Sequence, residues 1–140
     1  MSDTDDRAVV RIASCACRAL RVTATGQPRI VNACACLACQ NRTGSAFSYT
    51  AFFPDTAVEI PRGFRSWRAL RDAGRWHEVF FCPECGVTVF SRLEVFPDLI
   101  GISIGCFGEP AFERPHGYYW ASRRHHWVLL PDGVPISETQ

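Results

Sequence analysis

The chain has 140 residues, the length of one ordinary domain that can bury its own hydrophobic core. Its 47% hydrophobic and 21% charged residues are typical of a soluble globular protein, and no apolar run approaches the roughly 18 residues of a membrane span. The formal net charge of +1 gives no bulk attraction to nucleic acid or membranes. We therefore expect a single domain over residues 8–135, with loose ends at 1–7 and 136–140, that binds neither.

Short segments of alternating or β-branched residues predict strands along most of the chain. The first two, at 8–12 and 18–23, predict a hairpin that carries Cys15 and Cys17 at its tip. Prolines and glycines separate the later segments. The single helical turn that the pattern predicts covers 37–42. Further strands are expected at 29–32, 47–53, 57–60, 66–70, 76–81, 87–91, 99–104, 118–121 and 127–130. This pattern predicts an all-β domain with little helix.

Eight cysteines form two pairs, one triplet and a single residue. The pairs are Cys15/Cys17 and Cys82/Cys85, and the triplet is Cys34, Cys36 and Cys39. Two thiolates one or two residues apart on a tight turn can bind the same metal ion. A structural zinc site has four such ligands, whereas a catalytic site has three and an open position.

The second pair lies in the motif Cys82-Pro-Glu-Cys85-Gly86, between two predicted strands. A glycine directly after the second cysteine tolerates the positive φ of a zinc-ribbon knuckle. This pair needs two further thiolates, which either Cys15 and Cys17 or two members of the triplet could supply. The spacing alone leaves that partition open.

An even number of cysteines also permits a disulfide framework. The chain begins with an acidic, polar segment that lacks the basic and apolar regions of a secretory signal. Disulfides are rare in the reducing cytosol. We therefore expect a cytoplasmic protein with zinc-binding cysteines; iron–sulfur clusters also use four thiolates, but the short turns favour zinc.

Three cysteine motifs in register resemble the glutathione-dependent formaldehyde-activating enzyme family, also called the centromere protein V domain. The resemblance covers residues 8–135 and includes the segment 42–47, the motif 81–86 and the late segment 127–135. It departs from the family at two places. Ala35 stands inside the triplet where relatives often have histidine, and the segment 105–108 lacks the usual acidic residue.

The resemblance implies a β-tent of antiparallel sheets and two zinc ions per chain. It assigns Cys15, Cys17, Cys82 and Cys85 to a structural zinc. It assigns Cys34, Cys36 and Cys39 to a catalytic zinc with an open position. The implied activity is that of a carbon–sulfur lyase on thiol adducts of small aldehydes, such as S-(hydroxymethyl)glutathione. The alternative is a non-catalytic zinc-stabilised binding module.

A thiol substrate such as glutathione carries carboxylates, which need hydrogen-bond donors. Arg42, Thr43, Gly44 and Ser45 directly follow the triplet and are candidates for these contacts, although Thr43 and Ser45 also suit a turn. Cys106 is either a buried small hydrophobe, which we favour, or a fourth ligand that closes the triplet's site. We expect none of the four histidines to bind metal, and the sequence leaves homo-oligomer formation open.

Overall fold

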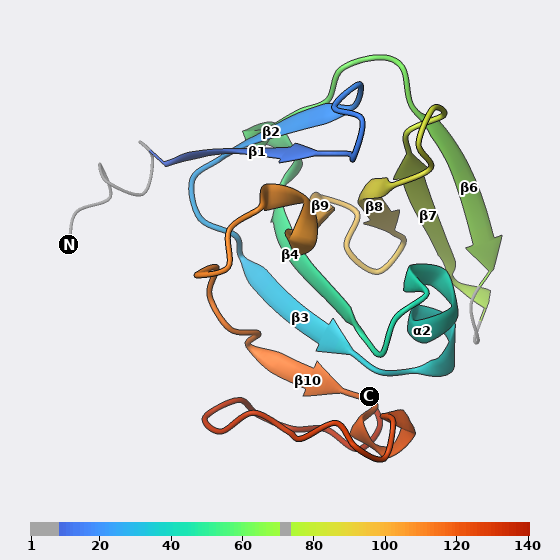
Figure 1. The fold of residues 1–140 in the computed structure, drawn as a ribbon, viewed down its shortest axis with the longest axis vertical. Coiled ribbons are helices and arrows are strands. Elements are labelled where there is room, and N and C mark those ends of the chain that lie inside the picture. Colours follow the sequence, from blue (N-terminus) through green and yellow to red (C-terminus); the bar gives the residue numbers. More distant parts are fainter. Residues whose placement is uncertain (1–8, 71–73) are drawn as a thin grey trace.

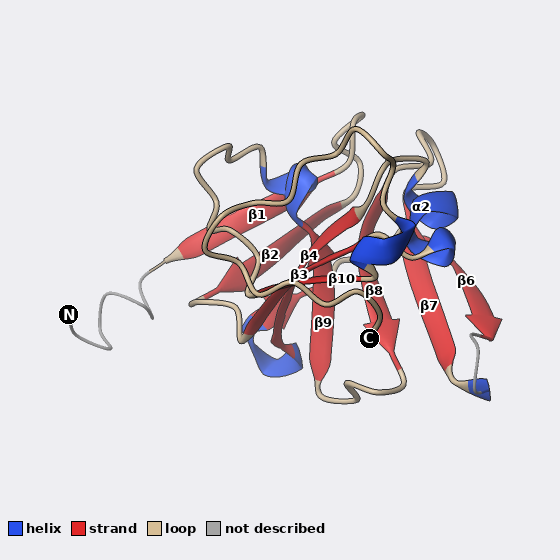
Figure 2. Ribbon diagram, turned by 90° about the horizontal axis from the view of Figure 1, so that it is seen from below, coloured by secondary structure: helices blue, strands red, loops and turns tan. Residues whose placement is uncertain are grey.

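The computed structural model describes residues 9–70 and 74–140 and confirms an all-β fold with little helix. Its strands form two sheets (Figure 1, Figure 2). The smaller sheet has the order β1 (Val10–Ser14), β2 (Arg21–Thr25), β5 (Val58–Glu59). The larger has the order β10 (Gly117–Tyr119), β3 (Ile30–Cys34), β4 (Ser48–Pro54), β9 (Leu99–Ser103), β8 (Thr88–Leu93), β7 (Trp76–Phe81), β6 (Arg65–Leu70).

Neighbouring strands in both sheets are antiparallel except β10 and β3, which are parallel. The described residues form one α-helix, α2 (Leu37–Thr43), which follows β3 directly. Short 3-10 turns are η1 (Asp55–Ala57), η3 (Ile104–Phe107) and η4 (Ala121–Arg123). No helix in the described ranges is long and apolar enough to cross a membrane.

The hydrophobic core lies on one face of the larger sheet, against the hairpin of β1 and β2. Directly opposed residues in paired strands share a face, and successive residues alternate between faces. The pairs Ala51–Ile102 and Phe90–Ile102 therefore lie on the core face. The hairpin covers them with Leu20, Val22 and other side chains of the same core cluster.

The opposite face of the larger sheet carries polar groups instead. Asn32 is paired with Thr50, and Cys34 with Ser48, so these four side chains share that face. Phe52 pairs with Gly101 and thus lies on the same face, further along β4. A strand that is apolar on one face and polar on the other normally turns the polar face toward solvent or a ligand.

Two predictions about the C-terminal region differ from the structure. Residues 127–130 form no strand, because Arg124 binds the Val128 carbonyl through Nε and the Ala121 carbonyl through Nη1, which closes local turns. Residues 136–140 were expected to be a loose end. Instead, backbone bonds join Ser137 N to the Tyr118 carbonyl and Trp120 N to the Thr139 carbonyl. The expected loose end at 1–7, and Ala8 of the first predicted strand, lie outside the described residues.

Candidate metal centres

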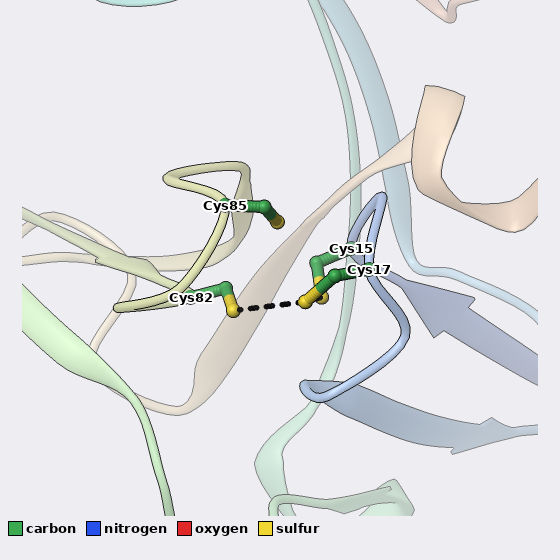
Figure 3. A group of neighbouring side chains, drawn as sticks. All are labelled: Cys15, Cys17, Cys82 and Cys85. Atoms are coloured by element: carbon green, nitrogen blue, oxygen red, sulfur yellow. Dashed lines mark hydrogen bonds between the residues drawn. The ribbon is translucent and has the colours of Figure 1, made fainter.

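The tips of two separate hairpins bring four cysteines together (Figure 3). Cys15 and Cys17 lie in the turn after β1, and Cys82 and Cys85 in the turn after β7. All four sulfur atoms lie within 4.8 Å of one another. The structure thus pairs Cys82 and Cys85 with the N-terminal cysteines and leaves the triplet separate. The N-terminal cysteines therefore supply the two further thiolates near the second pair.

Each of the two turns has one residue with positive φ directly after its second cysteine. The amide of Leu20 donates to the Cys15 sulfur (3.2 Å), and the amide of Glu84 donates to the Cys82 sulfur (3.3 Å). Gly86 has φ 79°, as its place after the second cysteine predicts. In the first turn the equivalent residue is Arg18, with φ 68°. A non-glycine residue costs free energy in this conformation, so the turn is held by its surroundings.

The sulfur spacing of this group fits a tetrahedral zinc ion. Zinc–sulfur bonds of about 2.3 Å at tetrahedral angles place sulfur atoms about 3.8 Å apart. The observed distances are 3.7 Å between Cys15 and Cys17 and 3.6 Å between Cys17 and Cys82. The backbone amide of Val87 contributes most to lowering the pKa of Cys85, to about 6. Four ligands fill a tetrahedral shell, so this group would leave no open position.

The triplet is built where β3 gives way to α2. Cys34 is the last residue of β3, Cys36 is the N-cap of α2, and Cys39 is three residues into the same helical turn. The Cys39 amide donates to the Cys36 sulfur (3.3 Å), which fixes the start of the helix. Cys36 and Cys39 are three residues apart and so lie on one side of the helix. The end of β3 places Cys34 beside them, and all three sulfur atoms lie within 4.8 Å of one another. Their spacing and soft donor set also fit zinc.

Arg42 places a positive charge beside the triplet. Its Nη2 atom lies 3.7 Å from the Cys39 sulfur. A hydrogen bond from Cys34, followed by the Arg42 charge, outweighs burial and lowers the pKa of Cys39 to about 4. The same Cys34–Cys39 contact, together with burial, raises the pKa of Cys34. One thiolate is therefore stabilised in this group by the chain itself.

The next three residues close the end of the helix. The Thr43 hydroxyl donates to the Cys39 carbonyl (2.8 Å) and accepts from the Ser45 amide (3.2 Å). Gly44 caps α2 in the left-handed conformation, with φ 65°. Gly44 and Ser45 line a hollow with His125 and Trp127, away from the triplet. Of the four predicted substrate contacts, only Arg42 lines the cavities beside the cysteines.

Cys106 belongs to neither group of sulfur atoms. It packs against the main core cluster, and its thiol donates to the Thr88 carbonyl (3.7 Å). Burial, together with the charges of Cys15 and Cys85, raises its pKa to about 11. Its neighbours are therefore those of the four-cysteine group, and among the described residues it does not complete the triplet.

Two cavities share the triplet as part of their walls. The first, of about 470 Å³, contains Cys34, Cys39 and Arg42 and extends to Phe96; we call it the Phe96 cavity. The second, of about 720 Å³, contains Cys34, Cys36 and Arg42 and extends between α2 and β6 to Trp67, Trp120 and Arg123; we call it the Trp67 cavity. Figure 1 shows α2 facing β6 and β7. The triplet thus lies where two cavities adjoin.

Several polar residues of the Phe96 cavity were not predicted from the sequence. They lie on the polar face of the larger sheet: Asn32, Ser48, Thr50, His77 and Ser91. His77 is buried and lines both cavities, but it is not part of either cysteine group. The sequence did contain one signal for this polar face. Asn32 precedes Cys34 by two residues and therefore lies on the same face of the strand.

The chain matches a known protein family over most of its length. A family model described as glutathione-dependent formaldehyde-activating enzyme matches residues 10–123. That range includes all eight cysteines and Arg42.

One curated relative, from Emericella nidulans, is provisionally named as a glutathione-dependent formaldehyde-activating enzyme. It is 31% identical over 81 residues, which are 58% of this chain and 41% of the relative. The match thus spans less than half the length of that relative. A crystal structure of a Rhodobacter sphaeroides protein is 17% identical, with a TM-score of 0.48 over 73% of this chain and 90% of the other.

Proposed function

Because the chain belongs to the glutathione-dependent formaldehyde-activating enzyme family, we propose that it is a zinc-dependent carbon–sulfur lyase. The substrates are thiol adducts of small aldehydes, such as S-(hydroxymethyl)glutathione. Cys34, Cys36 and Cys39 hold the catalytic zinc, and the four-cysteine group holds a structural zinc.

The observation that carries this proposal is the difference between the two cysteine groups. The triplet converges on one point, and no fourth Cys, His, Asp or Glu of residues 9–70 and 74–140 joins it. The other group has four ligands. Three protein ligands with an open position are typical of catalytic zinc, and four of structural zinc. The cavities beside the triplet supply the space that a substrate would need.

Zinc, when bound, lowers the pKa of an incoming thiol and so supplies its thiolate at neutral pH. In the reaction a bond forms between the thiol sulfur and the aldehyde carbon, and the thiol proton ends on the former carbonyl oxygen. Carbon–sulfur cleavage is the reverse. In either direction the chain must hold the thiol's remaining groups and the carbonyl compound in fixed positions.

Arg42 and Arg123 suit the acidic groups of a glutathione-like thiol. The Arg42 Nε atom is buried and has no hydrogen-bond partner within the described parts of the chain. A buried donor without a partner is costly, and a substrate carboxylate would satisfy it. Arg123 lines the Trp67 cavity beside Trp120, and its guanidinium lies 5.7 Å from that ring. The peptide part of the thiol therefore belongs in the Trp67 cavity.

Exchange spectroscopy by NMR tests this function. The zinc-loaded protein is mixed with glutathione and formaldehyde at equilibrium, and exchange between free and hydroxymethylated thiol is measured against the uncatalysed rate. We expect acceleration by the wild-type protein and by Cys106→Ala, and none by Cys36→Ser. Absence of acceleration by the fully loaded wild type, across several thiols and aldehydes, would favour the non-catalytic binding module.

A further inference from the structure

The Phe96 cavity is much larger than formaldehyde requires. A molecule of two non-hydrogen atoms needs about 60 Å³, taking about 30 Å³ for each water-sized unit. The cavity holds about 470 Å³, within the usual range for sites that bind drug-sized ligands. The space beyond the triplet therefore fits a ligand group far larger than a single carbon.

The far end of this cavity is apolar. Phe52 and Phe96 meet edge to face, with ring centroids 5.2 Å apart. Leu93, Val95 and Trp76 complete that end. Phe52 lies four residues along β4 from Ser48, the partner of Cys34, so about 13 Å of strand separates the apolar end from the cysteines. Aromatic and aliphatic side chains in a cavity bind apolar groups of matching size.

Gly101 keeps the floor of this end open for the Phe52 ring. A Cβ atom at Gly101 would lie 2.8 Å from Cε1 of Phe52 and 2.9 Å from the Ser91 hydroxyl. Such contacts do not occur in relaxed structures, so any other residue here would displace the ring. The aromatic end of the cavity therefore depends on a position without a side chain.

A polar atom between the cysteines and the apolar end lacks a partner. The Asn32 Oδ1 atom is buried and accepts no hydrogen bond from any described residue. It lines the Phe96 cavity, two residues before Cys34 on the same strand face. A buried acceptor without a donor is costly, so the site suits a ligand that brings one. The hydroxyl of a thiol–aldehyde adduct is such a donor, one carbon away from the sulfur.

We propose that the Phe96 cavity binds the substituent of the carbonyl compound and selects aldehydes that carry an apolar, ring-sized group. This inference rests on the proposed function, because it places the reacting sulfur at the triplet. Addition forms the sulfur–carbon bond, and the thiol proton passes to the carbonyl oxygen to give the adduct hydroxyl. Asn32 accepts a hydrogen bond from that hydroxyl, and the substituent packs against Phe52 and Phe96.

Binding of two stable thioethers tests the cavity without any reaction. S-benzylglutathione and S-methylglutathione differ only in the group that would enter the Phe96 cavity. Calorimetry on the zinc-loaded full chain should show the benzyl compound binding at least tenfold more tightly, since differences of one or a few apolar groups give about 10–200-fold. Equal binding of the two compounds would overturn the proposal.

Phe96→Ala is the variant that removes one wall of the apolar end. Phe96 is half-buried in the connection between β8 and β9, so its loss should leave the fold intact. Phe64→Ala is the control, because Phe64 is also a partly exposed ring but lines neither cavity. We expect the benzyl preference to fall about tenfold in Phe96→Ala and to persist in Phe64→Ala. If the benzyl preference persists in both variants, the benzyl ring binds outside the Phe96 cavity and the proposal is overturned.

Exchange rates separate this inference from the proposed function. The zinc-loaded protein should accelerate exchange of glutathione with phenylacetaldehyde more than with formaldehyde. If formaldehyde exchange is accelerated as strongly, the carbon–sulfur chemistry stands and the cavity assignment fails. If neither aldehyde exchanges faster than the background while S-benzylglutathione still binds preferentially, the proposed function fails and the cavity assignment stands.

Discussion

The Nη2 atom of Arg42 lies 3.7 Å from the sulfur of Cys39. This contact joins the cysteine triplet to both cavities, because Arg42 lines each of them. Its positive charge also offsets the repulsion among the three thiolates that would hold a metal ion. In the proposed function Arg42 therefore supports both the triplet and the substrate, so its replacement should affect the triplet and leave the four-cysteine group unchanged.

Arg42→Ala should weaken zinc binding at the triplet about 10–100-fold, as loss of hydrogen-bond partners of metal ligands generally does. Zinc at the four-cysteine group should be unaffected, because the Arg42 side chain lies beside Cys39 of the separate triplet. Titration with a chromogenic chelator would resolve one weakened and one unchanged zinc. Arg123→Ala is the control, since Arg123 also lines the Trp67 cavity but its guanidinium lies over the Trp120 ring. Equal weakening of zinc binding in both variants would show that Arg42 has no specific effect on the triplet.

Loss of a cysteine should have opposite consequences in the two groups. Cys85→Ser or Cys17→Ser should prevent folding, because a structural zinc contributes on the order of 10 kcal/mol. That is comparable to the whole stability of a domain, about 5–15 kcal/mol. Cys36→Ser should leave a folded protein. Circular dichroism and thermal melts check this, and equal disruption by the two kinds of substitution would contradict our assignment of ligands.

Gly86→Ala should destabilise the second cysteine turn by about 1–2 kcal/mol. Gly86 has φ 79°, and a Cβ atom there meets nothing within 4 Å, so the cost is conformational. Gly105→Ala is a matched control, because a Cβ atom at Gly105 also meets nothing within 4 Å but the residue lacks positive φ. Urea unfolding of the zinc-loaded proteins measures both. A change at Gly105 as large as that at Gly86 would show that backbone conformation is not the cause.

The ion pair between Arg68 on β6 and Glu78 on β7 predicts a small dependence of stability on pH. Arg68 Nη2 lies 2.9 Å from Glu78 Oε1, across directly opposed positions. Desolvation raises the pKa of Glu78, but hydrogen bonds from Arg68 and Ser66 outweigh it and hold that pKa below its ordinary value. A carboxylate with a lowered folded pKa stabilises above the unfolded pKa, and that stability disappears as pH falls through the folded value.

Glu78→Gln should therefore cost up to about 1 kcal/mol at pH 7, because Arg68 is largely solvent-exposed. The cost should shrink as pH falls toward and below the unfolded pKa of about 4.3, because the charge then contributes less to stability. Urea midpoints at pH 7 and at the lowest pH at which the protein keeps its zinc measure this difference. A cost that is the same at both values would show that packing, rather than charge, is responsible.

The strands were largely predictable from sequence because they alternate and lie between prolines and glycines. The prediction for 76–81 matches β7 at both ends. The prediction of a strand at 127–130 was wrong because an apolar run forms a strand only when a neighbouring strand is available to pair with it. Leu129 is 91% exposed and Trp127 68%, and Arg124 uses the local carbonyls. The parallel pairing of β10 with β3 has no local sequence signal, since it joins residues 85 positions apart.

Sequence motifs identified the cysteines but not the cavities between which the triplet lies. Short spacing brings together Cys34, Cys36 and Cys39, because one strand end and one helical turn place them. Cys15 and Cys82 come together only because two hairpins pack against each other, and the spacing of cysteines in the sequence does not predict that packing. Phe52 and Phe96 meet across a sheet and a connection, so only the tertiary structure reveals the apolar end of the Phe96 cavity.

The central claim is that one cysteine group is closed and the other keeps an open position. Anomalous diffraction at the zinc edge, from crystals grown with glutathione, measures the ligands of each zinc directly. We predict two zinc peaks per chain: one with four protein sulfur ligands, and one with Cys34, Cys36 and Cys39 plus an exogenous ligand. A fourth protein ligand at the triplet, such as Cys106 sulfur at about 2.3 Å, would contradict the claim, as would zinc at the four-cysteine group alone.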